Sequence, residues 1–286
     1  MRLLYLTLAL LAGCAPLPSE VTLAGQFIWN GGDEGFGGIS GLEVIDGGTR
    51  YVALNDKGLI RTGPILREDG EIIAMPIETR YRLKRPDGRR VNKEFSDSEG
   101  LAIGIDGLTY VSFEGETRVA VYGDTTDPAA QELVHPEFEK LSGNASLESL
   151  AIGPDGGLFA IPERSGRANR PFPVYRYREG AGWDIPFRLP RRGAFLIVGA
   201  DVGPDGLLYV LERDFTGAGF RSRVRRFSLT GADETVLLQT ANAAHDNLEG
   251  ISVWQDPQRG LIMTLVSDDN FQFFQQTEVI EYRIDR

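Results

Sequence analysis

Carboxylates recur at a nearly fixed interval in this chain, and their spacing is the first sign of a chemical site. Five related segments begin at positions 40, 99, 148, 198 and 249, which lie 59, 49, 50 and 51 residues apart. Three segments begin with a glutamate, namely Glu99, Glu148 and Glu249. The other two begin with Ser40 and Val198, so we do not expect a complete ring of acids.

A second set of acids follows the next apolar run of each repeat. These segments are Asn55-Asp56, Glu114, Glu163-Arg164, Glu212-Arg213-Asp214 and Asp268-Asp269-Asn270. In an antiparallel hairpin the start of the first strand lies beside the end of the second, so both sets are expected on one rim. Clustered carboxylate oxygens suit hard cations. We therefore predict a calcium site formed by Glu99, Glu148, Glu249, Asp56 and Asp268.

A simpler reading remains open, in which these acids accept backbone N–H bonds or pair with neighbouring cations. Lys57, Arg164 and Arg213 each directly follow a rim acid. The same three cations are our candidates for binding an anionic substrate beside the metal.

The candidates for catalysis are Glu99, Glu249, Asp268 and His245. His245 lies four residues before Glu249, where it could act as a base or a ligand. The chain has only two histidines and no Gly-x-Ser-x-Gly segment, so we do not expect a serine–histidine triad. No HExxH motif and no phosphate-binding glycine loop occurs either.

The elements that must position these residues are short strands. Each repeat has an apolar run, an Asp-Gly turn such as Asp106-Gly107 or Asp205-Gly206, and a second apolar run. Third and fourth runs follow, and about 50 residues with four strands is the size of a propeller blade. We predict an all-β propeller with five blades by repeat count. The long first interval leaves six as an alternative.

The last repeat has three clear strands, and residues 23–29 can supply the fourth. The predicted ring is therefore closed by pairing of the N- and C-terminal strands. The second residue of each repeat is Gly41, Gly100, Ser149, Gly199 or Gly250. Only small side chains occur there, which we attribute to crowding around the axis.

The N-terminus predicts export. Arg2 precedes an apolar run at 3–11, which is too short to span a bilayer. The run ends in Leu11-Ala12-Gly13-Cys14, which resembles the lipobox of bacterial lipoproteins. The alternative is an ordinary signal peptide with an incidental cysteine. Because Cys14 is the only cysteine of the chain, we predict that it is lipidated.

These readings divide the chain into a signal peptide (1–13), a lipidated cysteine and tether (14–20) and one domain (21–286). Ala15 after the cysteine, in place of an acid, favours the periplasmic face of the outer membrane of a bacterial envelope. The net charge of −11 argues against nucleic acid and against membrane contact other than through the lipid anchor.

Three strings resemble the bacterial phytase-like family, whose members are described as having esterase-like activity of phytase. They are residues 208–215 (LYVLERDF), Asn247-Leu248-Glu249-Gly250-Ile251, and Val266-Ser267-Asp268-Asp269-Asn270-Phe271. The resemblance covers about residues 36–284 and implies a propeller and hydrolysis of esters or phosphoesters. More distant propeller phytases and lactonases imply calcium. The resemblance assigns no individual catalytic residue.

Three functions remain open at this point. The first is a metal-assisted ester or phosphoester hydrolase acting on a small anionic substrate. The second is a non-catalytic propeller that binds a ligand or a protein. The third is a gluconolactonase-like lactone hydrolase, because those propellers also contain Glu-Gly-Leu followed by Asp-Gly. Fold alone does not separate them.

Overall fold

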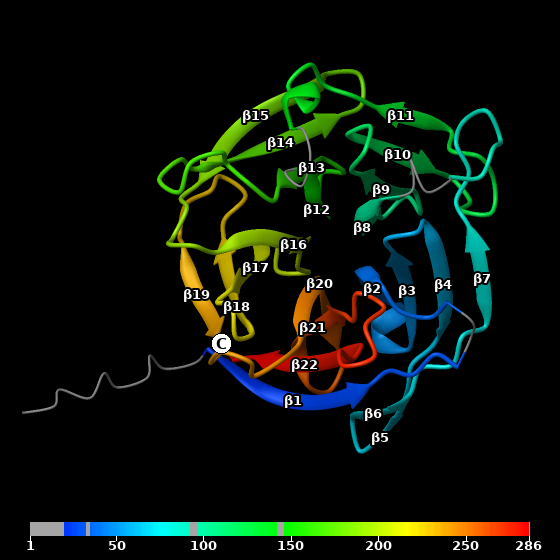
Figure 1. Cartoon of the computed structure of the whole chain (residues 1–286), viewed down its shortest axis with the longest axis vertical. Coiled ribbons are helices and arrows are strands. Elements are labelled where there is room, and N and C mark those ends of the chain that lie inside the picture. Colours follow the sequence, from blue (N-terminus) through cyan, green and yellow to red (C-terminus); the bar gives the residue numbers. More distant parts are fainter. Residues whose placement is uncertain (1–19, 33–34, 92–96, 142–145, 286) are drawn as a thin grey trace, which may run out of the picture.

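Five four-stranded antiparallel sheets stand around a central axis and form a five-bladed β-propeller (Figure 1). The computed structural model describes residues 20–32, 35–91, 97–141 and 146–285. The count of five blades is confirmed, and a sixth blade does not occur in the described ring. Cys14 and the predicted signal peptide lie outside the described residues, so lipidation stays a prediction.

Blades 1 to 4 each run from an inner strand at the axis to an outer strand. Blade 1 contains β2 (Ile39–Ile45), β3 (Arg50–Asn55), β4 (Leu59–Pro64) and β7 (Thr79–Arg82). Blade 2 contains β8 (Ser98–Ile103), β9 (Thr109–Phe113), β10 (Arg118–Tyr122) and β11 (Gln131–Leu133). Blade 3 contains β12 (Leu147–Ile152), β13 (Leu158–Pro162), β14 (Phe172–Arg178) and β15 (Gly182–Leu189). Blade 4 contains β16 (Leu196–Val202), β17 (Leu208–Phe215), β18 (Phe220–Phe227) and β19 (Thr235–Gln239).

Blade 5 joins the two ends of the chain. It contains β20 (Asn247–Asp256), β21 (Gly260–Asp268), β22 (Glu278–Ile284) and, as its outer strand, β1 (Val21–Ile28). β1 pairs antiparallel with β22 from Val21 opposite Ile284 to Ile28 opposite Glu278. The predicted closure of the ring by the N-terminal strand is therefore confirmed.

The long first interval contains a hairpin rather than an extra blade. β5 (Leu66–Glu68) and β6 (Glu71–Ala74) form a separate two-stranded sheet between β4 and β7. Arg67 of this hairpin donates two hydrogen bonds of 2.7 Å to the carboxylate of Glu281 in β22. The hairpin is thereby fastened to blade 5. Helical structure in the described residues is limited to two 3-10 turns, η1 (Asp46–Gly48) and η2 (Phe138–Lys140).

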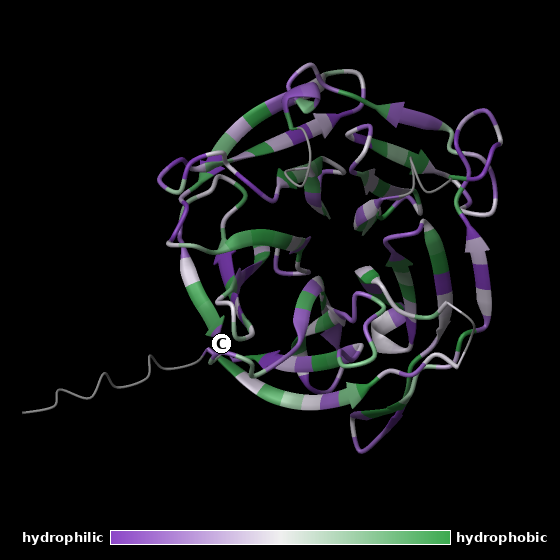
Figure 2. Cartoon of the chain, in the orientation of Figure 1, coloured by the Kyte–Doolittle hydropathy of each residue, from purple (hydrophilic) through white to green (hydrophobic). Residues whose placement is uncertain are grey.

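Hydrophobic side chains fill each gap between neighbouring blades. Five clusters of buried residues correspond to the five gaps, for example Leu54, Ile60, Leu101 and Val111 between blades 1 and 2. Figure 2 shows the strand pattern behind this packing, with hydrophobic and hydrophilic residues alternating along strands and hydrophilic residues prominent in the outer loops. Among the described residues there is no helix with the length and apolar character needed to span a bilayer.

The inner strands crowd one another as the small residues predicted. A Cβ on Gly199 would lie 2.5 Å from the carbonyl oxygen of Glu249 in the next blade. A Cβ on Gly41 would lie 2.7 Å from the Cβ of Leu101. The central channel between these strands has a volume of about 10 Å³, which is room for a single water molecule at most. The channel itself is therefore too narrow for an organic ligand.

The Asp-Gly turns form the opposite mouth, where their acids have structural roles. The side chains of Asp106, Asp155 and Asp205 each accept a hydrogen bond from the backbone N–H two residues later, at 3.1 to 3.2 Å. Asp201 of β16 lines the same mouth and accepts an N–H from Val253 of the next blade at 2.6 Å. These acids connect backbone segments and lie away from the rim that carries Glu99, Glu148 and Glu249.

Candidate functional site

A bulge in every inner strand marks the position where the site is built. In blades 1, 3, 4 and 5, pairing between the first two strands skips the first residue of the repeat, which is Ser40, Glu148, Val198 or Glu249. In blade 2 the pairing skips both Glu99 and Gly100. A bulge leaves its extra residue outside the ladder and re-aims its side chain. In blades 2, 3 and 5 that side chain is a glutamate, and the three glutamates converge on the axis. The pKa of Glu99 is accordingly raised by burial and by the charges of Glu148 and Glu249.

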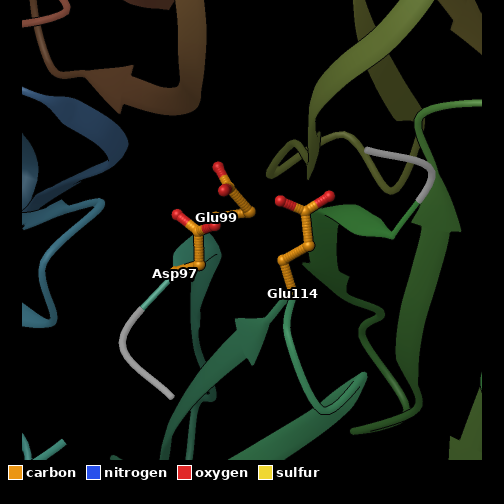
Figure 3. Close-up of side chains that lie close together, drawn as sticks. All are labelled: Asp97, Glu99 and Glu114. Carbon is orange, nitrogen blue, oxygen red and sulfur yellow. The ribbon is translucent and has the colours of Figure 1, made fainter. Parts of the chain in front are cut away.

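Blade 2 contributes the tightest group of carboxylates. One oxygen each of Asp97, Glu99 and Glu114 lies within 4.8 Å of the others, and Figure 3 shows the three side chains pointing toward one another. Asp97 directly precedes β8, Glu99 is the second residue of β8, and Glu114 follows the end of β9. A backbone hydrogen bond of 2.7 Å from Glu114 N–H to the Asp97 carbonyl fixes the two segments together. Burial and the neighbouring Asp97 raise the pKa of Glu114 to about 7.

On the side of blades 3 to 5, a guanidinium partly neutralises the acids. Arg213 donates to Glu249, to Glu163 at 3.3 Å and to the side-chain oxygen of Asn247 at 2.6 Å. Asn247 in turn donates to Glu249 at 2.9 Å. Glu148 stands in this group, and its pKa is raised by burial and by Glu163 and Glu249, with Arg213 opposing. Arg213, together with Arg164, which donates to Glu163 at 2.8 Å, thus faces the three carboxylates.

Blades 5 and 1 complete the mouth with further acids. Burial and the Glu249 charge raise the pKa of Asp268 to about 8, although Asp268 accepts the N–H of Asn270 at 2.7 Å. Burial also raises the pKa of Asp56 to about 6, against the opposing charge of Lys57. The ammonium of Lys57 lies 2.9 Å from the centre of the Phe271 ring. Lys57 is therefore held at the mouth by an aromatic face.

The five acids predicted from sequence as metal ligands lie around one mouth, but of these only Glu99 belongs to the tight carboxylate group of the described residues. Glu99, Glu148, Glu249, Asp56 and Asp268 influence one another's charges at one mouth. Asp97 was missed because it precedes the repeat motif and follows no strand in the sequence pattern. Its only sequence signal is the acid-rich run Asp97-Ser98-Glu99.

The predictions for two other residues, Glu212 and His245, have different outcomes. Glu212 was expected at the rim from its place at the end of a second strand, and this is wrong. It is fully buried inside blade 4 and accepts hydrogen bonds from Arg223 at 2.6 Å and Arg225 at 2.9 Å. The ring nitrogens of His245 face Glu278 at 3.3 Å and Tyr282 at 3.1 Å, both on β22. The structure thus gives His245 blade residues as partners, and its catalytic role remains untested.

A pocket of about 460 Å³ opens beside the mouth, between blades 3 and 4. Two predicted substrate-binding residues, Arg164 and Arg213, line it together with Arg191, which the sequence pattern did not single out. Arg191 lies in the loop before β16, away from the repeat motifs and with no acid beside it in the sequence. The only signal for it was the pair of consecutive arginines at 191 and 192.

The mouth fits a hard cation by the chemistry of its donors. Every donor in the Asp97–Glu99–Glu114 group is a carboxylate oxygen, which is what calcium prefers. In addition, the buried atoms Asp56 Oδ1 and Glu114 Oε1 have no hydrogen-bond partner in the described part of the chain. Buried polar atoms are usually paired, so carboxylate oxygens without a partner are compatible with a site that accepts a positive group.

The chain is similar to one known protein family and, in its fold, to solved structures. The model of the family described as "Phytase-like: Esterase-like activity of phytase" matches residues 34–271. No curated protein sequence matches the chain. Among solved structures, the PQQ-bound aldose sugar dehydrogenase of Streptomyces coelicolor aligns with a TM-score of 0.47 and 13% identity, covering 93% of this chain and 99% of that one. A catalytically inactive virginiamycin B lyase of Staphylococcus aureus, solved with quinupristin, aligns with a TM-score of 0.48 and 15% identity, covering 93% and 86%.

Proposed function

The chain belongs to the phytase-like family, and from that premise we propose that it is a metal-assisted hydrolase of esters or phosphoesters. Its substrate is a small anion that binds at the carboxylate mouth. The observation that carries the proposal is the Asp97–Glu99–Glu114 group, in which one carboxylate oxygen from each residue lies within 4.8 Å of the others. Such an arrangement is unfavourable for the folded protein alone and becomes favourable when a cation is bound.

The chemistry that a bound divalent cation supplies is positive charge, which stabilises the ester oxygens as they become negative and favours loss of a proton from water. The chain's own residues do the rest. The water oxygen forms a bond to the acyl carbon or phosphorus, and the bond to the departing alcohol breaks. Asp268 lies at the same mouth, and we propose that its ionised carboxylate accepts the proton of the water and returns it to the alcohol.

Calcium binding is the first test. Purified protein, freed of metal with EDTA and titrated with calcium, is expected to bind it in a calorimeter and to melt several degrees higher. Elemental analysis of protein purified without chelator is expected to find calcium. Protein that binds no calcium and shows no thermal shift would remove the metal from the proposal.

Hydrolysis is the second test, with a phosphomonoester, an aryl ester and a lactone as substrates. The double variant Glu99→Gln/Glu249→Gln is expected to lose both calcium binding and hydrolysis. The matched control Glu68→Gln/Glu179→Gln removes the same charge from two exposed positions away from the mouth and is expected to keep both. Calcium binding with no turnover of any substrate would instead favour a non-catalytic binding propeller, and turnover of the lactone alone would favour a lactonase.

The location in the cell is a separate proposal that rests on Cys14 and the run before it. We expect the protein in the membrane fraction of a bacterial envelope, with label from radioactive palmitate. Cys14→Ser is expected to abolish the label and to move the protein to the soluble periplasmic fraction. An unchanged membrane fraction would contradict the lipid anchor.

A further inference from the structure

We propose that Arg191, Phe215 and Phe220 form a substrate-binding subsite for a singly charged oxyanion that carries an aromatic or alkyl group. The inference deepens the proposed function and rests on it for the chemistry, although binding at the subsite is measurable without turnover. The subsite is the pocket of about 460 Å³ between blades 3 and 4, a size that suits a small organic ligand.

Arg191 differs from the other two arginines of the pocket in having no carboxylate partner. Arg164 donates to Glu163 at 2.8 Å, and Arg213 pairs with Glu249 and Glu163. Within the described residues Arg191 makes no ion pair, and its buried Nε atom has no hydrogen-bond partner; its guanidinium lies 5.6 Å from the centre of the Phe172 ring, a contact that leaves its positive charge without an opposite charge. Its charge is therefore available to a ligand, and a guanidinium binds carboxylate, sulfonate and phosphate oxygens well.

The backbone on both sides of Arg191 is held by a buried ionic network. Arg225 donates to the carbonyl of Pro190 at 2.9 Å, and Arg223 donates to the carbonyl of Arg192 at 3.0 Å. Both arginines are buried and share the carboxylate of Glu212. A loop fixed in this way presents its one unpaired guanidinium in a constant place, which is how a binding residue is preorganised.

Two aromatic side chains, Phe215 and Phe220, form another wall of the pocket. Phe215 is 63% exposed at the end of β17, and its ring centroid lies 5.0 Å from that of Phe220 on β18. A large apolar side chain exposed next to charged groups at a pocket is a typical ligand contact. A purely polar anion would leave this wall in water. The ligand that uses both walls is an oxyanion joined to an apolar group.

The acids in the pocket limit the ligand's charge. Glu163 and Asp214 also line it, and each is already paired with an arginine, Asp214 with Arg221. A multiply charged anion would meet these carboxylates, whereas a single charge needs only Arg191. Because Arg213 lines the pocket and also bonds Glu249, the subsite is continuous with the carboxylate mouth. The ester bond of a substrate bound in this subsite would therefore lie near the carboxylates of the mouth.

The test uses 1-naphthalenesulfonate as the probe, titrated in EDTA so that neither metal nor turnover contributes. Wild-type protein is expected to bind it, and neither methanesulfonate nor naphthalenemethanol is expected to bind comparably. Arg191→Gln is expected to weaken binding about tenfold or more, since a charged hydrogen-bonding partner is lost. Phe215→Ala is expected to weaken it about threefold to tenfold.

Arg188→Gln is the matched control, because Arg188 is an exposed arginine that lines a neighbouring pocket instead. It is expected to bind the probe as wild type does. Arg191→Lys keeps the charge and is expected to retain most of the affinity, which separates loss of the charge from loss of the fold. Equal weakening by Arg188→Gln and Arg191→Gln, or equal binding of methanesulfonate, would overturn the subsite. Probe binding with no hydrolysis in any assay would leave the subsite standing and reject only the hydrolase.

Discussion

At the scale of single residues, the acids of the mouth differ in how far their charge is neutralised. Glu249 is bonded to Arg213 and Asn247, whereas Glu99 faces mainly other acids. The sequence predicted this gathering because hairpin geometry places strand starts beside strand ends. The sequence did not predict that the Glu212 side chain would be buried inside its blade. That burial depends on the arginines of β18 that donate hydrogen bonds to Glu212. Arg191 was likewise beyond a sequence argument, since its importance comes from a missing partner.

Glu148→Gln is expected to stabilise the metal-free protein at pH 8. Burial and nearby acids make the Glu148 carboxylate unfavourable, and glutamine removes the charge while keeping the shape. The melting temperature is expected to rise by a few degrees, because about 1 kcal/mol corresponds to ~2–4 °C for a chain of this size. Differential scanning calorimetry at pH 8 and pH 5 measures it, with Glu179→Gln as the control. A fall in melting temperature at pH 8 would mean that the carboxylate is stabilised by contacts instead.

At the scale of elements, the bulge in each inner strand connects the fold to the site. The repeat motif is visible in the sequence, and its period gives the blades and their order. The bulge is not visible, because a skipped residue and a paired one look alike in a string of letters. Ser40 and Val198 occupy the same bulge as the glutamates. The bulge is therefore a feature of how the inner strands pack. Glutamates at three of its five positions provide the carboxylates of the candidate site.

Gly199→Ala is expected to destabilise the protein by about 1–3 kcal/mol, because its Cβ would lie 2.5 Å from the Glu249 carbonyl oxygen. Relief of this close contact would also move β20 outward and weaken calcium binding by Glu249. Gly123→Ala is the control, since nothing lies within 4 Å of a Cβ there. Urea unfolding of both variants measures the difference. Equal stability of the two variants would contradict the close packing of the inner strands.

At the scale of the whole molecule, the propeller has two unlike faces. One mouth carries many acids with raised pKa values. The other carries turn acids that bond backbone N–H groups, together with Glu43 and Asp201, whose pKa values are raised by burial. The first kind is protonated in the folded state at a pH where it would be ionised in the unfolded chain. The second kind includes Asp155, whose pKa is lowered by Arg178 and Gly157.

The free energy of unfolding of the metal-free protein is expected to fall as pH rises from 5 to 8. The folded pKa values of Asp56, Glu114 and Asp268, at about 6, 7 and 8, lie above their unfolded values. Between the two values the folded state binds more protons, so raising the pH favours unfolding. Calcium is expected to reverse the loss and to stabilise more at pH 8 than at pH 5. Urea titrations at three pH values, with and without calcium, measure both effects. A stability that rises toward pH 8 without calcium would contradict the raised pKa values.

The pairing of β1 with β22 means that the ring has no necessary starting point. The backbone N–H of Asp285 donates to the carbonyl of Glu20 at 2.9 Å, so the first and last described residues are neighbours, as Figure 1 shows. A circular permutant that joins them by a short linker and opens the outer turn at Gly180 would keep every strand pair of the five blades. In such a molecule the carboxylate mouth would be unchanged while the chain ends moved to blade 3. The site is thus a property of the closed ring, independent of the order in which its blades are synthesised.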